Sequence, residues 1–382
     1  MAKLCMLVSN GVLSDPRVTK EAASLSPYHD VFVVGISKEE LVGEPQPGNY
    51  TVRLAKEPSL PLQGTLGKAA RKMIGCLRMT RLAYLWRADV YHAHDLDMLP
   101  FAYLLSAIRG AKLVYDSHEL WAEQRADFPG WFKKMVMNIE RLLIRRSDRV
   151  ITVNHSIATE LKERYRLQTL PVIIHNFSKK APLELVQREG ASVTVLYHGG
   201  YMNDRGLEEF VDSAAHLTSG TRIILRGMGP LENRLRAMIA DISSGAVELL
   251  PPVSMKALVR EAAQSDIGII PYKPTCLNNY YSLPNKLSEY AMAGLAICAS
   301  DLPEIRRIVV KHQMGELFDP NDPMSIAAAI DKLASDPEYL ERCKRNARAW
   351  AESEGNWEFE QLKLLKLYNE LLGESDEKAM DR

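Results

Sequence analysis

The stretch Val193-Thr194-Val195-Leu196-Tyr197-His198-Gly199-Gly200 decides the fold class. Its β-branched and aromatic run, Val193–Tyr197, predicts a buried strand, and the two glycines indicate a tight turn where that strand ends. An amphipathic run, Leu207–Leu217, follows and predicts a helix. A strand, a turn and a helix in this order form the repeating unit of a parallel sheet that is covered by helices.

The same unit recurs in both directions along the chain. Before this stretch, the strand-like runs are Lys3–Val8, Val31–Gly35, Thr51–Ala55, Val90–Ala93, Lys112–Tyr115, Arg149–Val153 and Val172–His175. After it, they are Arg222–Leu225, Val247–Leu249, Ile267–Ile270, Ala296–Ala299 and Gly315–Leu317. The helical patterns are Arg17–Leu25, Ala102–Ile108, Ser156–Tyr165, Leu207–Leu217, Leu231–Ile242, Met255–Gln264, Asn285–Ala293 and Pro323–Leu333.

A polar segment without a strand-like run, Ser178–Ser192, separates two halves of similar pattern and predicts a linker. We therefore expect an α/β protein with two tandem Rossmann-like, doubly wound domains that face each other across a cleft, at residues 1–180 and 181–352. The apolar spacing of Trp357–Leu372 predicts a helix. We expect residues 353–382 to supply this helix, packed back on the first domain, and a disordered tail.

The composition is that of a folded protein in a reducing compartment. Hydrophobic residues make up 46% of the 382 residues and charged residues 25%, and no apolar run approaches the roughly 18–20 residues that span a bilayer. The apolar run in Met1–Val8 is shorter than that of a signal peptide and predicts a first strand. The five cysteines are scattered without Cys-x-x-Cys spacing, which indicates free thiols rather than a disulfide framework or a zinc site.

The densest local signal is the stretch Tyr281–Gly294, which reads YSLPNKLSEYAMAG. Pro284 predicts the start of a helix and Gly294 its end. The first turn of such a helix, with Lys286 in it, suits a diphosphate because free backbone N–H groups and a positive charge meet there. Glu289 lies one turn later, where a carboxylate accepts hydrogen bonds from ribose or sugar hydroxyls. A capped surface helix is the alternative interpretation of the same pattern.

Several motifs in order resemble those of the retaining glycosyltransferases of family four, which have two Rossmann-like domains in the GT-B fold. The matching residues are Ser14-Asp15-Pro16-Arg17-Val18, Gly206-Leu207, Gly227-x-Gly229-Pro230, Pro284-x-Lys286-x-x-Glu289-Tyr290-x-x-x-Gly294 and Ala299-Ser300-Asp301-x-Pro303-Glu304. They extend over almost the whole chain. The resemblance implies a nucleotide-sugar donor as substrate and no bound metal or other cofactor.

The resemblance also implies roles for individual residues. Glu289 matches the glutamate that holds the nucleotide ribose, and Arg205, just before Gly206, matches a basic residue that contacts the pyrophosphate. Lys286 is similar to the lysine of relatives with a Pro-x-Lys donor loop. The remaining candidates for donor binding lie beside these residues: Ser282, Asn285, Gly199 and Gly200.

Two positions depart from the family pattern. Many relatives carry a glutamate eight positions before the one that matches Glu289, where this chain has Tyr281. Many also carry an arginine after the first strand of the second domain, where this chain has His198-Gly199-Gly200. The first departure removes a familiar contact to the transferred sugar. The second removes a phosphate contact, for which Lys286 is the candidate replacement.

The acceptor side is expected at the carboxyl ends of strands in the first half. His118 follows the strand-like run Lys112–Tyr115 and resembles the active-site histidine of the family, which implies that it positions the reacting sugar. His92 and His94 end the preceding strand; we interpret them as lining residues because two histidines and Asp95 leave a closed metal site incomplete. Further acceptor-side candidates in the first loop are Asn10, Gly11 and Arg17.

Charge and apolar residues together indicate a second type of partner. Residues 1–180 contain 26 Lys+Arg against 18 Asp+Glu, whereas residues 181–382 contain 22 against 30. The segments 66–87 and 131–149 combine basic with apolar side chains, which favours peripheral binding to anionic lipid. Ordinary amphipathic helices with basic solvent faces explain the segments equally well. Nucleic acid is not expected, because no nucleic-acid-binding module is present.

These observations predict a cytoplasmic glycosyltransferase, at the inner face of a membrane, that moves a hexosyl or N-acetylhexosaminyl group. The expected donor is a UDP-sugar and the expected acceptor a saccharide or glycolipid of a bacterial surface polysaccharide. Two alternatives remain open at this level. A nucleotide-sugar epimerase shares the two-domain architecture, and a non-catalytic scaffold in a membrane assembly complex would accommodate the departures at Tyr281 and at Gly199-Gly200.

Overall fold

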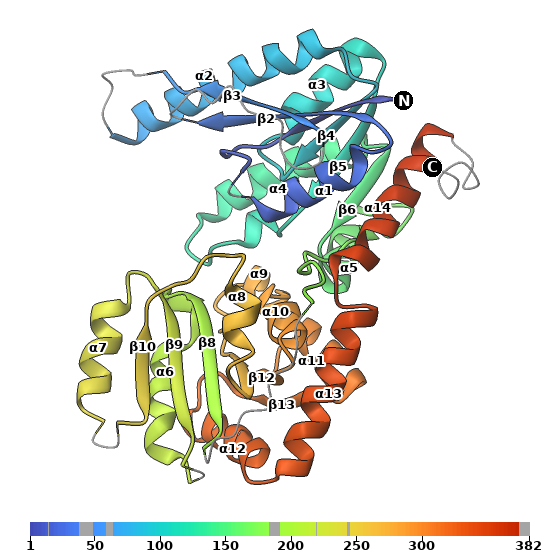
Figure 1. Ribbon diagram of the computed structural model, residues 1–382. Helices are drawn as coiled ribbons and strands as arrows, with labels where there is room; N and C mark the ends of the chain where they lie inside the picture. The colour runs from blue at the N-terminus through green and yellow to red at the C-terminus, as the bar shows by residue number, and fades with distance from the viewer. Residues whose placement is uncertain are drawn as a thin grey trace. The chain divides into compact units, whose positions relative to one another are not determined.

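The computed structural model describes residues 1–13, 15–37, 49–58, 64–182, 192–218, 220–242 and 245–373, with the side chains of residues 65 and 66 left out. The chain forms two compact units (Figure 1). Unit 1 comprises Met1–His175 and the segment that begins at Gln361, and unit 2 comprises Asn176–Glu360. The first boundary thus lies between residues 175 and 176 and the second between residues 360 and 361. The sequence patterns predicted boundaries after residues 180 and 352. The predicted disordered tail from residue 374, Ser14 and most of the predicted linker lie outside the described residues.

Unit 1 contains a parallel sheet in the order β3-β2-β1-β4-β5-β6-β7. Its strands are β1 (Lys3–Leu7), β2 (Asp30–Ser37), β3 (Thr51–Lys56), β4 (Val90–His94), β5 (Lys112–Ser117), β6 (Arg149–Thr152) and β7 (Val172–Ile173). The α-helices are α1 (Pro16–Leu25), α2 (Gly64–Trp86), α3 (Leu99–Arg109), α4 (Gly130–Ile144) and α5 (His155–Tyr165). The chain leaves β1 in one direction and returns on its other side at β4, so the topological switch point lies between these two strands.

Unit 2 repeats this plan with a parallel sheet in the order β10-β9-β8-β11-β12-β13. Its strands are β8 (Thr194–Gly200), β9 (Arg222–Met228), β10 (Val247–Leu250), β11 (Ile267–Ile270), β12 (Ala296–Ser300) and β13 (Gly315–Phe318). Its α-helices are α6 (Leu207–Ser213), α7 (Glu232–Ala240), α8 (Leu258–Ala262), α9 (Leu277–Tyr280), α10 (Lys286–Met292), α11 (Pro303–His312), α12 (Pro323–Ala334) and α13 (Pro337–Ser353). Here the switch point lies between β8 and β11.

The predicted fold of two Rossmann-like domains is confirmed. Every predicted strand is present, with ends that differ by at most a few residues. The predicted start of the helix in the Tyr281–Gly294 stretch was wrong, because α10 begins at Lys286 and Pro284 lies in the turn before it. The predicted end is confirmed: α10 stops at Met292, and Gly294 has the left-handed backbone, with φ of +78°, that follows a helix end.

The helix α14 (Trp357–Leu372) begins in unit 2 and ends in unit 1. Its first residue donates a backbone hydrogen bond to Ser178. Leu364, Leu367 and Tyr368 lie further along the helix and are buried, so the final turns of α14 contribute to the core of unit 1. Among the described residues, each helix is either too short or too polar to cross a bilayer.

Candidate active site

Two cations of unit 2 gather on one aromatic ring. The Nζ of Lys286 donates a hydrogen bond to the Tyr272 hydroxyl at 3.1 Å and lies 5.2 Å from the centroid of the Tyr197 ring. The guanidinium carbon of Arg205 lies 4.0 Å from the centroid of the Tyr272 ring. We call Tyr197, Arg205, Tyr272 and Lys286 the basic cluster. The Nη1 of Arg205 lies 3.5 Å from the Asp204 carboxylate, which is a long contact for an ion pair. Both cations therefore keep N–H donors that a phosphate could accept.

Glycines allow this approach. A Cβ atom on Gly199 would lie 2.8 Å from the Lys286 Nζ, and the φ of Gly199 is +127°. A Cβ atom on Gly206 would lie 2.0 Å from the Pro271 carbonyl oxygen, and the φ of Gly206 is +61°. The Pro271 backbone thus excludes a side chain at Gly206, whereas at Gly199 the backbone conformation disfavours one and the end of Lys286 would have to move. Gly199 is the penultimate residue of β8 and Pro271 follows β11, so the basic cluster lies at the switch point where ligands of such sheets bind.

Glu289 is oriented by a histidine that the sequence analysis did not include among its site residues. The Nε2 of His198 lies 2.8 Å from Glu289 Oε2, and the His198 backbone N–H donates to the Tyr290 hydroxyl at 2.9 Å. Both Glu289 and His198 are buried. Burial lowers the pKa of His198, against the opposing effect of Glu289. The sequence signal that could have identified His198 as a site residue was its position directly before Gly199-Gly200.

The remaining donor-site candidates lie around the turn before α10. The Ser282 hydroxyl donates to the Asn279 carbonyl oxygen at 2.8 Å, and Asn285 is exposed. Tyr281, at the position of the missing glutamate, has its ring 5.3 Å from that of Tyr280. Among the described residues, the side chains of Ser282 and Asn285 make no hydrogen bond with the basic cluster.

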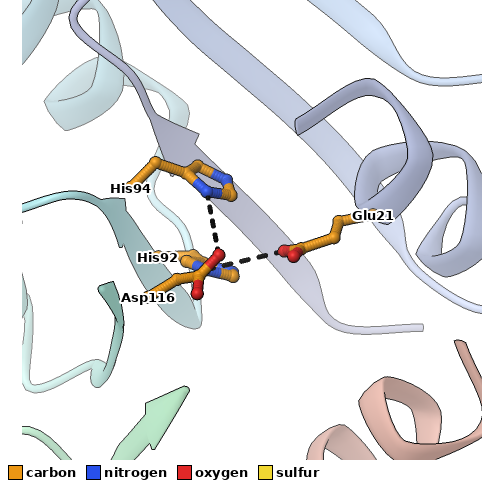
Figure 2. Close-up of side chains that lie close together, drawn as sticks. All are labelled: Glu21, His92, His94 and Asp116. Atoms are coloured by element: carbon orange, nitrogen blue, oxygen red, sulfur yellow. Dashed lines mark ion pairs between the residues drawn. The ribbon is translucent and has the colours of Figure 1, made fainter. Parts of the chain in front are cut away.

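The candidate residues of unit 1 meet at the ends of β4 and β5. Arg17 of α1 donates two hydrogen bonds to Asp116, at 2.7 and 2.8 Å, and one to the Ile174 carbonyl oxygen at 2.8 Å. Figure 2 shows the side chains of Glu21, His92, His94 and Asp116 converging on one point. Arg17 and these four residues are buried. We call Arg17, Glu21, His92, His94, Asp95, Asp116 and His118 the histidine–carboxylate cluster.

His118 has a carboxylate at each ring nitrogen. Its Nε2 lies 3.0 Å from Asp116 Oδ2, and its Nδ1 lies 3.3 Å from Asp95 Oδ2. Its backbone N–H also donates to Asp95 Oδ1 at 3.0 Å. Burial by itself lowers the pKa of His118, but the charges of Asp95 and Asp116 outweigh it and raise this pKa to about 10. His118 is therefore an imidazolium at neutral pH.

The deeper part of this cluster holds buried polar atoms. Both carboxyl oxygens of Glu21 and the Nε2 atoms of His92 and His94 are buried and have no hydrogen-bond partner among the residues that the structure describes. Burial, together with the charge of Asp116, raises the pKa of Glu21 to about 8 although Arg17 opposes it. Burial lowers the pKa of His92 well below its usual range. The Nδ1 of His92 forms a 2.8 Å hydrogen bond with the hydroxyl of Tyr368, which α14 supplies.

Geometry alone would allow a metal ion among Glu21, His92, His94 and Asp116, because one ligand atom from each lies within 4.8 Å of the others. Arg17 argues against this interpretation. Its Nε lies 3.1 Å from Glu21 Oε1 and 2.7 Å from Asp116 Oδ2, so a cation already stands between the two carboxylates. A divalent ion there would face an adjacent positive charge. The expectation of no metal stays a prediction.

The first loop is held by its own hydrogen bonds. The Asn10 side chain donates to Asp15 at 2.9 Å and accepts from the backbone of Val12, and Asp15 caps α1. Gly11 borders open space. Arg17, by contrast, is only 2% exposed. Its position in the interior favours a structural role over contact with an acceptor. His94 is also buried, with its Nδ1 3.2 Å from the His118 Nε2.

Comparison with known protein families gives a match in each unit. Residues 24–177 match the model described as Glycosyltransferase Family 4, and residues 192–336 match that of Glycosyl transferases group 1. The chain belongs to glycosyltransferase family 4. This family has the GT-B fold, retains the anomeric configuration of the sugar and generally works without metal.

Individual relatives of this family 4 protein are distant. The glycogen synthase of Mycobacterium tuberculosis is 24% identical over 284 residues, which are 72% of this chain and 66% of that protein. The chain thus spans slightly less than two thirds of this relative. Sucrose-phosphate synthase from Thermosynechococcus elongatus has the same fold, with a TM-score of 0.75, 15% identity and coverage of 98% of this chain and 100% of its own. The Anabaena protein Alr3699/HepE in complex with UDP follows, with a TM-score of 0.74, 15% identity and coverage of 97% and 100%.

Proposed function

We propose that the protein is a retaining glycosyltransferase whose donor, a UDP-sugar, binds to unit 2. The basic cluster carries this proposal. Arg205 and Lys286 present two cations at the switch point of a doubly wound sheet, which is where phosphorylated ligands of such folds bind. A departing nucleoside diphosphate gains negative charge in the transition state, so fixed cations stabilise it more than they stabilise the bound donor.

Each residue has a distinct task in this proposal. The guanidinium of Arg205, kept in orientation by the Tyr272 ring, donates to diphosphate oxygens, and Lys286 adds a point charge beside the hydroxyl of that ring. Glu289 accepts hydrogen bonds from the ribose hydroxyls while His198 holds its carboxylate. UDP is favoured as the nucleotide because Alr3699/HepE, of the same fold, was crystallised with UDP.

We propose that the acceptor is a saccharide or a lipid-linked saccharide of a surface polysaccharide and that the protein acts at the cytoplasmic side of a membrane. The helices α2, α3 and α4 pack beside one another and expose large apolar side chains. On α2, α3 and α4 these are Met73, Leu77, Tyr84, Leu85, Leu104, Ile108, Trp131, Met135, Ile139 and Leu142. We call this surface the α2–α4 face. The only acidic residue of the three helices, Glu140, is buried, so the charged side chains that the face presents are basic, which suits anionic lipid.

The donor site is tested by nucleotide binding. Arg205→Ala and Glu289→Gln should each weaken UDP binding at least about tenfold, because each removes a charge-assisted hydrogen bond, while the fold survives. Isothermal titration calorimetry measures the affinity, and circular dichroism checks the fold. Arg234→Ala is the matched control: it removes an exposed arginine that pairs with Glu208, away from the basic cluster. Unchanged affinity for UDP in both site variants would refute the donor site.

Product analysis then separates transfer from the alternatives. A transferase consumes a donor only when an acceptor is present and releases UDP. An epimerase would convert the donor sugar without an acceptor, and a scaffold would do neither. Incubation of UDP-glucose and UDP-N-acetylglucosamine with saccharide acceptors, followed by chromatography of nucleotides and sugars, distinguishes these outcomes.

A further inference from the structure

The carboxylates around His118 lie on two different strand ends and contact the ring from opposite edges. Asp116 belongs to β5, and Asp95 follows the end of β4. Each ring nitrogen of His118 faces one of them, at 3.0 Å for Asp116 and 3.3 Å for Asp95. A carboxylate beside each ring nitrogen favours the doubly protonated ring, in which neither nitrogen has a lone pair for a proton from an acceptor hydroxyl. The arrangement thus disfavours the usual role of histidine as a general base.

Asp95 is held in an uncommon backbone conformation to make this contact. Its φ is +65°, a left-handed value that costs free energy in most non-glycine residues and is tolerated best by Asn and Asp. Its Oδ1 accepts the backbone N–H of His118 while its Oδ2 faces the ring. The Asp95 backbone N–H donates to the Asp116 carbonyl oxygen at 2.9 Å. One residue thus fixes both the backbone and the ring of His118.

The two carboxylates differ in what else they bind. Asp116 is fully buried and holds Arg17 through both oxygens, so it belongs to the scaffold of unit 1. The side chain of Asp95 is 31% exposed, and the ring of His118 is 15% exposed. We call the two carboxylates that flank the His118 ring the clamp. Its Asp116 side is buried, and its Asp95 side is accessible to solvent. A change at Asp95 can alter His118 without removing the buried pair of Asp116 and Arg17.

We propose that Asp95 is a positioning residue that, together with Asp116, holds His118 as a fixed imidazolium, and that His118 takes part in sugar transfer as a cation rather than as a base. This inference rests on the proposed function and names a residue that the resemblance did not assign. The charge of His118 then stabilises negative charge that develops on substrate oxygens.

The charged and titratable groups around His118 set the expected pH dependence. Asp95 and Asp116 favour its charged form, whereas Arg17 disfavours it, and the Nδ1 of His94 lies 3.2 Å from the His118 Nε2. Burial raises the pKa of Asp95 itself to about 7, although the charge of His118 opposes this. Glu119 and Asp15 lie further out, where they interact with Asp95 and with His118 respectively. Loss of the Asp95 charge should lower the pKa of His118 towards neutrality. An alkaline decline in turnover should then appear at lower pH.

The test is Asp95→Asn in the full chain. Asn tolerates the left-handed backbone, and its side-chain oxygen can still accept the His118 backbone N–H, while its uncharged NH2 group replaces the carboxylate oxygen that faces the ring. Asp97→Asn is the matched control, since it removes a carboxylate two residues away that pairs with Lys72. NMR titration of the His118 ring should show a pKa at least one unit lower in Asp95→Asn than in the wild type or the control.

Activity provides the second readout. With UDP-sugar and acceptor, the alkaline limb of kcat against pH should move to lower pH by the same amount in Asp95→Asn, while UDP affinity stays unchanged. A His118 pKa that is equal in wild type and variant would overturn the clamp. A lowered pKa with an unchanged pH profile of kcat would overturn the catalytic role of the charge. Failure of the proposed function is distinguishable, because the wild type would then show no turnover while the NMR titration would still report on the clamp.

Discussion

Arg17 shows how a side chain that looks available in the sequence is used in the interior. It lies in the first turn of α1 after a conspicuous loop, which favoured an anionic acceptor as its partner. In the structure it is buried, and it donates to Asp116 and Ile174 and lies 3.1 Å from Glu21. A buried guanidinium needs such partners because desolvation of an unpaired charge is costly. The folded state thus uses all three nitrogens of the Arg17 guanidinium as hydrogen-bond donors.

Glu21 leads to a prediction about pH and stability. Burial raises its pKa in the folded protein to about 8 from an ordinary value of 4.5. The folded state therefore binds a proton that the unfolded state releases. The stability that this proton contributes is fully present below about pH 4.5 and is lost as the pH rises through about 8. Glu21→Gln removes this titration. Between pH 5 and pH 8, the free energy of unfolding of the wild type should therefore fall by roughly 1–3 kcal/mol more than that of the variant.

Urea unfolding at pH 5 and pH 8 measures this difference. Glu160→Gln is the control, because Glu160 is a more exposed glutamate of unit 1 that pairs with Arg164. A difference between the two pH values that is the same for wild type and Glu21→Gln would show that Glu21 is already ionised in the folded protein at pH 5.

At the scale of elements, the turn between β8 and α6 leaves little room for a larger residue at Gly206. Gly206 adopts φ of +61° directly beside the carbonyl of Pro271, the residue that follows β11. Arg205 precedes this glycine and lies over Tyr272, the neighbour of Pro271 in sequence. The close approach of the two backbones thus places the guanidinium on the aromatic ring. A displacement of this turn would move Arg205 out of the basic cluster.

Alanine substitution at two glycines with left-handed backbones separates the cost of that backbone conformation from the cost of the contact with Pro271. Gly206→Ala should lower the free energy of unfolding by roughly 2–4 kcal/mol, because its Cβ meets the Pro271 carbonyl oxygen in addition to the cost of the left-handed backbone. Gly220→Ala should cost only about 1 kcal/mol, because Gly220 has φ of +64° but borders open space. Thermal and urea unfolding measure both, and UDP affinity should fall only in Gly206→Ala. Equal losses of stability would show that the turn can relax away from Pro271.

At the scale of the whole molecule, the opposite net charges of the two halves have a structural counterpart in the surface of unit 1. The α2–α4 face carries apolar side chains among basic ones, and Lys134 and Arg141 lie exposed on α4, the helix that also exposes Trp131. Large exposed apolar patches on folded proteins indicate interaction sites. The matching feature in the sequence was the pair of segments 66–87 and 131–149, whose side chains the helices α2 and α4 present to solvent.

The face should bind anionic lipid. Sedimentation with vesicles of phosphatidylglycerol and phosphatidylcholine should retain the wild type, whereas vesicles of phosphatidylcholine alone should not. Lys134→Glu combined with Arg141→Glu should weaken binding at least about tenfold, because each basic residue near an anionic surface contributes about 1 kcal/mol. The control reverses two exposed basic residues of unit 2, in Lys256→Glu with Arg260→Glu. Equal binding of the two double variants would contradict the assignment of the face.

The sequence by itself determined the strands, the fold class and the family, whereas the helices α11 (Pro303–His312) and α13 (Pro337–Ser353) were not predicted. Strand-like runs and glycine turns are local signals, and thirteen strands appear where period and β-branched residues predicted them. Gly199, Gly206 and Gly294 were also readable, because each is required by local backbone geometry. The charged residues Arg205, Lys286 and Glu289 could be named as donor-site candidates because the resemblance assigned them. The start of α10 could not be read correctly, because Pro284 lies just before the helix rather than in its first turn.

Only the tertiary structure decided which side chains meet. His198 reaches Glu289, and Tyr272 supports both Arg205 and Lys286, across separations of 14 to 91 residues in the chain. Neighbouring parallel strands bring their carboxyl ends to one edge of the sheet. Arg17 therefore faces inward, and Asp95 contacts both the backbone N–H and the ring of His118. Burial raises the pKa of Glu21 and the carboxylates of Asp95 and Asp116 raise that of His118, so the charge of each depends on surrounding groups that come from distant parts of the sequence. A sequence names titratable residues, and packing determines their charge.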